Sequence, residues 1–241
     1  MKSRQTDTRY THGWLDCWDC YQDRKDPYQY KDWELRHEPG YAGSCNPRIL
    51  LLGFSKGATQ SGKAKQGDYD KVPFAGMRGR VQRILETLEL MPQDRGIDEM
   101  LTAREVEFGA ASLVRCTLCH IENGKPITSG AMITASFEAP EIKKIIRRCA
   151  DRYLADLPQS LQRVILLGTN PDYIEKTSQL FQVLYPDFEW INPVAFRARG
   201  AIWVYAAHPS KANGRFENWV KAQPDDPSGY KCLLAKEALK G

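Results

Sequence analysis

The sequence predicts an α/β fold, a three-layer α/β/α sandwich with a short, mostly parallel central sheet. Apolar runs that stop abruptly at glycine or at a polar loop are typical of buried parallel strands. Segments with apolar residues at helical spacing alternate with these runs. A hydrophobic content of 42% in 241 residues is enough for a substantial core, so we expect one domain spanning residues 1–241.

The expected core strands are four short apolar runs. They occupy residues 48–53, 108–114, 164–168 and 202–207. Residues 190–196 form either an edge strand or a loop. Because helical segments separate the core runs, we expect them to pair in parallel.

The expected helices cover residues 78–90, 140–157 and 172–184. The first of these repeats apolar residues every three to four positions, which gives it one buried face. Residues 54–71 are rich in glycine and lysine and predict a long loop, and residues 123–126 predict another. The tail from residue 223 predicts a turn and then a short helix.

Residues 1–45 have no helical or strand periodicity, so we expect loops and short helices docked on the rest of the domain. The amino terminus has no apolar segment typical of a signal peptide, and no apolar run reaches about 18 residues. We therefore expect a cytoplasmic protein without a membrane segment. The net charge of +4 permits a nucleic-acid partner but does not require one.

The seven cysteines are clustered in a way that favours metal binding. An odd count without a secretion signal argues against a disulfide framework. Two pairs have CxxC spacing and three cysteines stand apart: Cys17 with Cys20, Cys116 with Cys119, and Cys45, Cys149 and Cys232 singly. This spacing indicates a metal ion or a metal cluster.

Residues 201–219 contain the most informative pattern in the chain. An apolar strand stops at His208, and Pro209 cannot continue a strand ladder. The histidine is therefore expected at the carboxyl edge of the sheet, where α/β proteins usually bind ligands. The alternative is a histidine that satisfies only local hydrogen bonds.

Four segments, in this order, resemble the uracil-DNA glycosylase superfamily, most closely its iron–sulfur families four and five. They are ILLLGFSKGATQSG (49–62), VPFAGMRGRVQRIL (72–85), SLVRCTLCHIENGKPI (112–127) and YAAHPS (205–210). The resemblance implies an α/β sandwich and base excision after a nucleotide is flipped out of the stack.

The resemblance also implies roles for residues of these motifs. His208 is the donor that stabilises negative charge on the departing base, and Ser55 is the second catalytic candidate. The base-binding candidates are Gly53, Phe54, Phe74, Ser112 and His208. For Phe74, stacking on the base and packing in the core are equally open.

The DNA-binding candidates flank the same motifs. They are Lys56, Ser210, Lys211, Asn213 and Arg215, with Lys63 and Lys65 as further phosphate contacts or as parts of a solvated loop. Ser210 alternatively steadies its loop. Phe216 either inserts as a wedge into the gap left by the flipped base or packs in the core beside Trp219.

Two departures from the pattern bear on activity. The first motif of family four has a carboxylate just after its first glycine, whereas this chain has Phe54; family five also lacks that acid. Ser112 stands where many members have an asparagine that reads uracil, and a hydroxyl discriminates less sharply. Hypoxanthine or xanthine are therefore alternative bases.

In families four and five, an amino-terminal CxxC pair and two later cysteines hold a four-iron cluster. Cys17, Cys20, Cys116 and Cys149 match these ligands, with Cys119 as a rival for the third. An insertion near residues 128–137 accounts for the long spacing between Cys116 and the fourth ligand, Cys149. Zinc on the same thiolates is the less favoured occupant. Cys45 and Cys232 are expected not to be ligands.

The resemblance therefore implies a monofunctional, monomeric DNA glycosylase acting on DNA that contains uracil or another deaminated base. Lys56 is the only Schiff-base candidate near the site. The alternative is an inactive nucleic-acid-binding protein of the same fold. A nucleotide hydrolase is a weaker alternative, because GFSKGATQSGK does not have the Walker A order.

Overall fold

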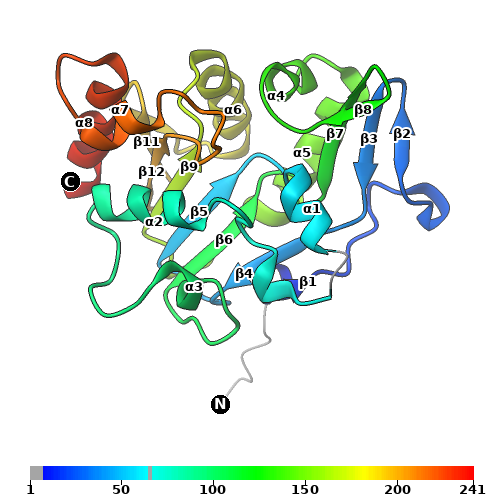
Figure 1. Ribbon diagram of the computed structural model, residues 1–241, viewed down its shortest axis with the longest axis horizontal. Coiled ribbons are helices and arrows are strands. Elements are labelled where there is room, and N and C mark those ends of the chain that lie inside the picture. The colour runs from blue at the N-terminus through cyan, green and yellow to red at the C-terminus, as the bar shows by residue number, and fades with distance from the viewer. Residues whose placement is uncertain (1–7, 65–66) are drawn as a thin grey trace.

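A computed structural model describes residues 8–64 and 67–241, and it has a mixed α/β fold built on one large sheet (Figure 1). Eight strands pair in the order β1-β4-β6-β5-β9-β12-β11-β10. The central four are parallel: β6 (Phe108–Ser112), β5 (Ile49–Gly53), β9 (Arg163–Leu167) and β12 (Ala201–Ala206). These are the four predicted core strands, so that prediction is confirmed.

Antiparallel strands extend the sheet at both edges. β1 (Gly13–Trp14) and β4 (Gly40–Gly43) continue it beyond β6, and β11 (Ala195–Ala198) and β10 (Glu189–Asn192) continue it beyond β12. The ambiguous segment 190–196 is thus part of an edge hairpin.

The expectation of only loops and short helices in residues 1–45 is wrong. In addition to β1 and β4, β2 (Tyr28–Tyr30) and β3 (Trp33–Arg36) form there, with two short 3-10 helices, η1 (Thr8–Tyr10) and η2 (Gln22–Arg24). β4 pairs with β6 and β3 pairs with β7 (Thr117–Glu122), both far away in sequence. Because distant partners rather than an alternating local pattern stabilise these short strands, periodicity does not reveal them.

A second, four-stranded sheet has the order β2-β3-β7-β8 and stands at the right of Figure 1. β8 (Lys125–Ile127) pairs with β7 in a hairpin, so the loop predicted at 123–126 is only its tip. Asn123 and Gly124 both have positive φ, 49° and 72°, as a two-residue hairpin turn requires. The Asn-Gly pair was the signal for this hairpin.

The predicted helices form as α2 (Arg78–Thr87), α5 (Pro140–Leu154) and α6 (Pro171–Leu184). The first two end three residues earlier than predicted, and α6 begins one residue earlier. The tail forms α8 (Pro227–Lys240) after the short α7 (Phe216–Lys221). Residues 54–71 are not simply a loop, because they contain α1 (Ala58–Ala64) and η3 (Tyr69–Lys71). Two further short helices are α3 (Ile97–Met100) and α4 (Ala131–Ser136).

The core lies along the central strands. Leu50, Leu51 and Leu52 of β5 are fully buried, and each contributes about 2 kcal/mol through the area it removes from water. Phe181 of α6 packs against Trp203 of β12 with ring centroids 5.0 Å apart. In the described part of the chain, no helix is both long and apolar enough to cross a membrane.

Polar contacts attach the amino-terminal segment to α5. The Tyr10 hydroxyl donates to the carbonyl oxygen of Tyr153 (2.6 Å), and Arg152 pairs with Asp19 (2.6 Å). The Arg148 guanidinium donates to the Asp19 carbonyl oxygen (2.9 Å). The segment that carries Cys17 and Cys20 is therefore fixed beside the helix that carries Cys149.

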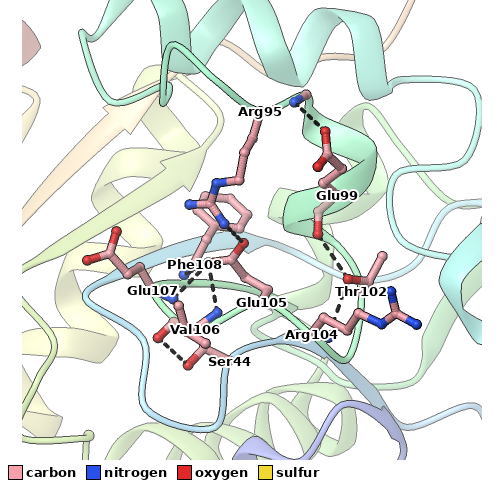
Figure 2. Close-up of polar contacts among 10 residues, drawn as sticks. Ser44, Arg95, Glu99, Thr102, Arg104, Glu105, Val106, Glu107 and Phe108 are labelled. Atoms are coloured by element: carbon pink, nitrogen blue, oxygen red, sulfur yellow. Dashed lines mark hydrogen bonds and ion pairs between the residues drawn. The ribbon is translucent and has the colours of Figure 1, made fainter.

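Figure 2 shows a polar network at the beginning of β6, the end of the strand opposite Ser112. The buried Glu105 carboxylate accepts from the backbone N–H groups of residues 106, 107 and 108 (3.0, 2.7 and 3.0 Å) and from Arg95 (2.7 Å). The Ser44 hydroxyl donates to the Val106 carbonyl oxygen (2.7 Å). Charge-assisted bonds of this kind fix where β6 begins.

Candidate functional site

The carboxyl ends of the parallel strands bring several predicted site residues to one edge of the sheet. Gly53 ends β5 opposite Ser112, which ends β6. A Cβ atom on Gly53 would lie 3.9 Å from the Ser112 hydroxyl oxygen, so the two are adjacent. His208 follows the end of β12 by two residues, and β12 is separated from β5 only by β9.

His208 is a neutral hydrogen-bond donor. Its Nδ1 atom accepts from the Ser210 backbone N–H (3.1 Å), so the proton of the neutral ring is on Nε2. Burial lowers the pKa of His208 to about 4, which keeps the ring uncharged at neutral pH. The Nε2–H group is therefore the one available to a ligand.

The loop after His208 is held by its own side chains. The Asn213 amide donates to the His208 carbonyl oxygen (2.8 Å), and its oxygen accepts from the Arg215 N–H (3.1 Å). The Ser210 hydroxyl oxygen accepts from the Ala212 N–H (3.2 Å). Both side chains steady the loop, whereas Lys211 and Arg215 are exposed and free to meet a polyanion.

Arg80 of α2 is a residue that sequence reasoning missed. Its guanidinium donates to the Ser210 carbonyl oxygen (2.5 Å) and lies 4.5 Å from the centre of the Phe216 ring. Phe216 is completely buried, so its interpretation as a DNA wedge is wrong and core packing is confirmed. Arg80 had no sequence signal beyond its place on the polar face of a helix.

The two phenylalanines of the predicted base site differ in environment. Phe54 is 3% exposed, and its ring lies 5.8 Å from that of Phe137 and 6.4 Å from that of Tyr173. Its side chain is part of the core, which corrects its assignment as a base-binding group. Phe74 is buried too, but it has a φ of +53°, a conformation that is strained for an aromatic residue.

Ser55 keeps an unused hydroxyl in the loop after β5. Its Oγ atom is buried and has no hydrogen-bond partner among the described residues. Leaving a buried hydroxyl unpaired costs about 1–3 kcal/mol, so this group has an unmet hydrogen bond.

Lys56 is not a phosphate contact, which corrects its DNA-binding assignment. The residue is only 4% exposed, and its ammonium group donates to the carbonyl oxygens of Glu38 (2.5 Å) and Arg115. Burial lowers the pKa of Lys56 to about 8. Of the other two lysines of this loop, Lys63 is half-buried and Lys65 lies outside the described residues.

Glu38 also escaped sequence reasoning. Its carboxylate accepts from the hydroxyls of Ser61 (2.8 Å) in α1 and Thr117 (2.5 Å) in β7. The residue thus links the loop after β5 with the second sheet. A lone glutamate in an irregular segment gave no signal for this role.

Four cysteines gather around one small pocket with a cavity volume of about 20 Å³. Cys17, Cys20, Cys116 and Cys149 line it, together with Tyr21, Arg115 and Tyr153. The rival Cys119 is buried opposite Glu34 of β3 and does not line the pocket. Cys45 is exposed and Cys232 is buried in α8, both away from this pocket.

The donor set fits a thiolate-bound cluster. Burial raises the pKa of Cys20 to about 11 and that of Cys149 to about 12, so these thiols need a metal or a cation to ionise. The Arg115 backbone N–H donates to the Cys149 sulfur (3.3 Å). Backbone donors to sulfur of this kind are found around iron–sulfur clusters.

A single zinc ion fits less well. Zinc requires its thiolate sulfurs at about 2.3 Å from one point. Within residues 8–64 and 67–241, no three histidine, cysteine or acidic side chains are close enough to hold one metal ion. An iron–sulfur cluster also takes thiolate ligands, and the four cysteines line one pocket.

Comparisons with known proteins show a distant likeness to solved structures. No family model and no curated protein matches the chain. Among solved structures, the crystal structure of wild-type Pedobacter heparinus SMUG2 is similar at 13% sequence identity and a TM-score of 0.38. The alignment covers 81% of this chain and 75% of that one. A likeness this distant assigns no function.

Proposed function

We propose that this chain is a monofunctional DNA glycosylase that hydrolyses the N-glycosidic bond of uracil or another deaminated base, on a uracil-DNA glycosylase-like sandwich acting as a monomer. The observation that carries the proposal is the neutral His208, with its Nε2–H unused, at the sheet edge where Gly53 and Ser112 also lie. The four ordered motifs that contain these residues support it.

The chemistry follows from the donors at this edge. As the bond between the sugar C1′ and the base nitrogen breaks, its electron pair stays with the base, which becomes negative. The His208 Nε2–H donates to a carbonyl oxygen of that base and stabilises the charge where it develops. Water adds to the electron-deficient C1′ and releases one proton to solvent, and the anionic base takes up one proton from solvent. The products are the free base and an abasic site.

The hydroxyls and the aromatic ring recognise the flipped base. Ser112 and the unpaired Ser55 hydroxyl hydrogen-bond to its edge, and each can donate or accept. Phe74, held in its strained conformation, supplies the stacking surface. Because residues 53–57 contain no acid, stabilising the leaving base provides most of the rate.

We further propose that Cys17, Cys20, Cys116 and Cys149 hold a four-iron cluster with a structural role. When bound, such a cluster cross-links the chain segments that its cysteines belong to. Here those segments are the amino-terminal segment, the bend just before β7 and helix α5. Exposed Lys211 and Arg215 contact DNA phosphates beside the base site.

An excision assay tests the activity. Labelled single- and double-stranded oligonucleotides with uracil, hypoxanthine or xanthine are incubated with protein and then cleaved with alkali at abasic sites. We expect a cut at one base, and a loss of at least about tenfold in His208→Ala because one charge-stabilising donor is removed. His120→Ala, in the β7–β8 hairpin, is the matched control.

The results separate two functions. An unchanged excision rate in His208→Ala would contradict the proposal that His208 stabilises the departing base. Binding of lesion-containing DNA without any cut would instead identify a binding protein of the same fold, the alternative that the missing acid after Gly53 favours.

A further inference from the structure

Arg115 carries a buried charge without a hydrogen-bond partner. The residue is 1% exposed, and none of its three guanidinium nitrogens has a partner among the described residues. A guanidinium remains charged at any working pH. An uncompensated buried charge is strongly destabilising, so the observed arrangement calls for an anion.

Within residues 8–64 and 67–241, no acidic side chain pairs with this guanidinium. The guanidinium carbon lies 4.8 Å from the centre of the Tyr153 ring and 5.7 Å from that of Tyr41. These ring faces attract a cation but replace only part of its hydration. The other nearby charge, the Lys56 ammonium on the Arg115 carbonyl oxygen, is also positive.

The position of Arg115 shows where the anion belongs. The residue lines the same pocket as the four cysteines and directly precedes Cys116. Its backbone N–H already donates to the sulfur of Cys149. Thiolates bound to iron and sulfide bring net negative charge into this pocket, and the charge of the surroundings tunes such a cluster.

We propose that the Arg115 guanidinium is the fixed counter-charge of the anionic iron–sulfur centre held by Cys17, Cys20, Cys116 and Cys149. It acts as a positioning residue that favours cluster retention and makes the cluster easier to reduce. The inference rests on the cluster proposed above and is independent of base excision.

The test compares wild-type protein, Arg115→Met and Arg115→Lys. Arg147→Met is the matched control, because Arg147 is two residues from Cys149 on α5 and pairs with Asp151 at the surface. Each full-length protein is stripped of metal and then reconstituted anaerobically with ferrous iron and sulfide. Iron and sulfide per chain, the rate of iron loss to a chelator, the reduction potential and urea stability are measured.

We expect reconstituted Arg115→Met to lose iron several-fold faster than wild type and to have a more negative reduction potential. Arg115→Lys retains the charge and should remain near wild type, as should Arg147→Met. In the metal-free state we expect Arg115→Met to be more stable than wild type and to need more urea to unfold. The reason is that the substitution removes an uncompensated buried charge.

The outcomes separate this inference from the cluster itself. If wild-type protein binds no iron and sulfide, the cluster proposal fails. If wild type binds them and Arg115→Met matches it in iron loss and potential, the counter-charge role alone is refuted. A metal-free Arg115→Met that is less stable than wild type, or does not fold, would show that Arg115 serves only to hold Tyr41 and Tyr153.

Discussion

The Lys56 ammonium group donates a hydrogen bond to the carbonyl oxygen of Arg115. Lys56 belongs to the loop after β5 that also carries Ser55, while Arg115 lines the cysteine pocket. The same ammonium donates to the Glu38 carbonyl oxygen, and the Glu38 side chain bonds to Ser61 and Thr117. One buried side chain thus joins the candidate base site to the candidate cluster site.

The stability of the protein should fall in mild acid because His208 is buried as a neutral ring. Its pKa is lowered from 6.5 to about 4, so the stability this provides is fully present above pH 6.5 and is lost as pH falls through 4. Between pH 6.5 and pH 4, the free energy of unfolding of wild type should therefore fall further than that of His208→Ala, by on the order of 2 kcal/mol. Urea unfolding at a series of pH values measures this difference. An identical pH dependence in both proteins would contradict it.

The salt dependence of DNA binding should identify which basic residues meet phosphates. Lys211→Ala and Arg215→Ala should each reduce the slope of log affinity against log salt by roughly 0.9, the value for one lost phosphate contact. Lys56→Met should leave the slope unchanged, because the buried ammonium is bound to two carbonyl oxygens. Binding titrations at several salt concentrations give the slopes. A reduced slope in Lys56→Met would show that Lys56 does contact a DNA phosphate.

Glu105 should be important for stability and not for excision. Glu105→Gln weakens three backbone hydrogen bonds and leaves Arg95 without its buried partner, which we expect to cost about 3 kcal/mol. Glu107→Gln, which loses an exposed pair with Arg48, should cost less than about 1 kcal/mol. Urea unfolding measures the loss of stability in each variant. The excision rate per folded molecule should stay at the wild-type value in both.

The sequence predicted the parts of the site that depend on local pattern. The four core strands and three main helices follow from hydrophobic periodicity, because burial of one face imposes it directly. The family resemblance assigned Gly53 and Ser112 to one base site, and the structure places them opposite each other at the ends of neighbouring parallel strands. The family resemblance grouped Cys17, Cys20, Cys116 and Cys149, and the structure places all four on the lining of one pocket.

Tertiary structure alone decided the remaining features. The strands of residues 13–43 form because distant partners supply their hydrogen bonds, which no local pattern encodes. Lys56 and Arg115 look like surface residues by composition, yet folding buries both beside the cysteine pocket. A side chain's type constrains its chemistry, whereas its exposure and partners depend on which distant segments pack around it.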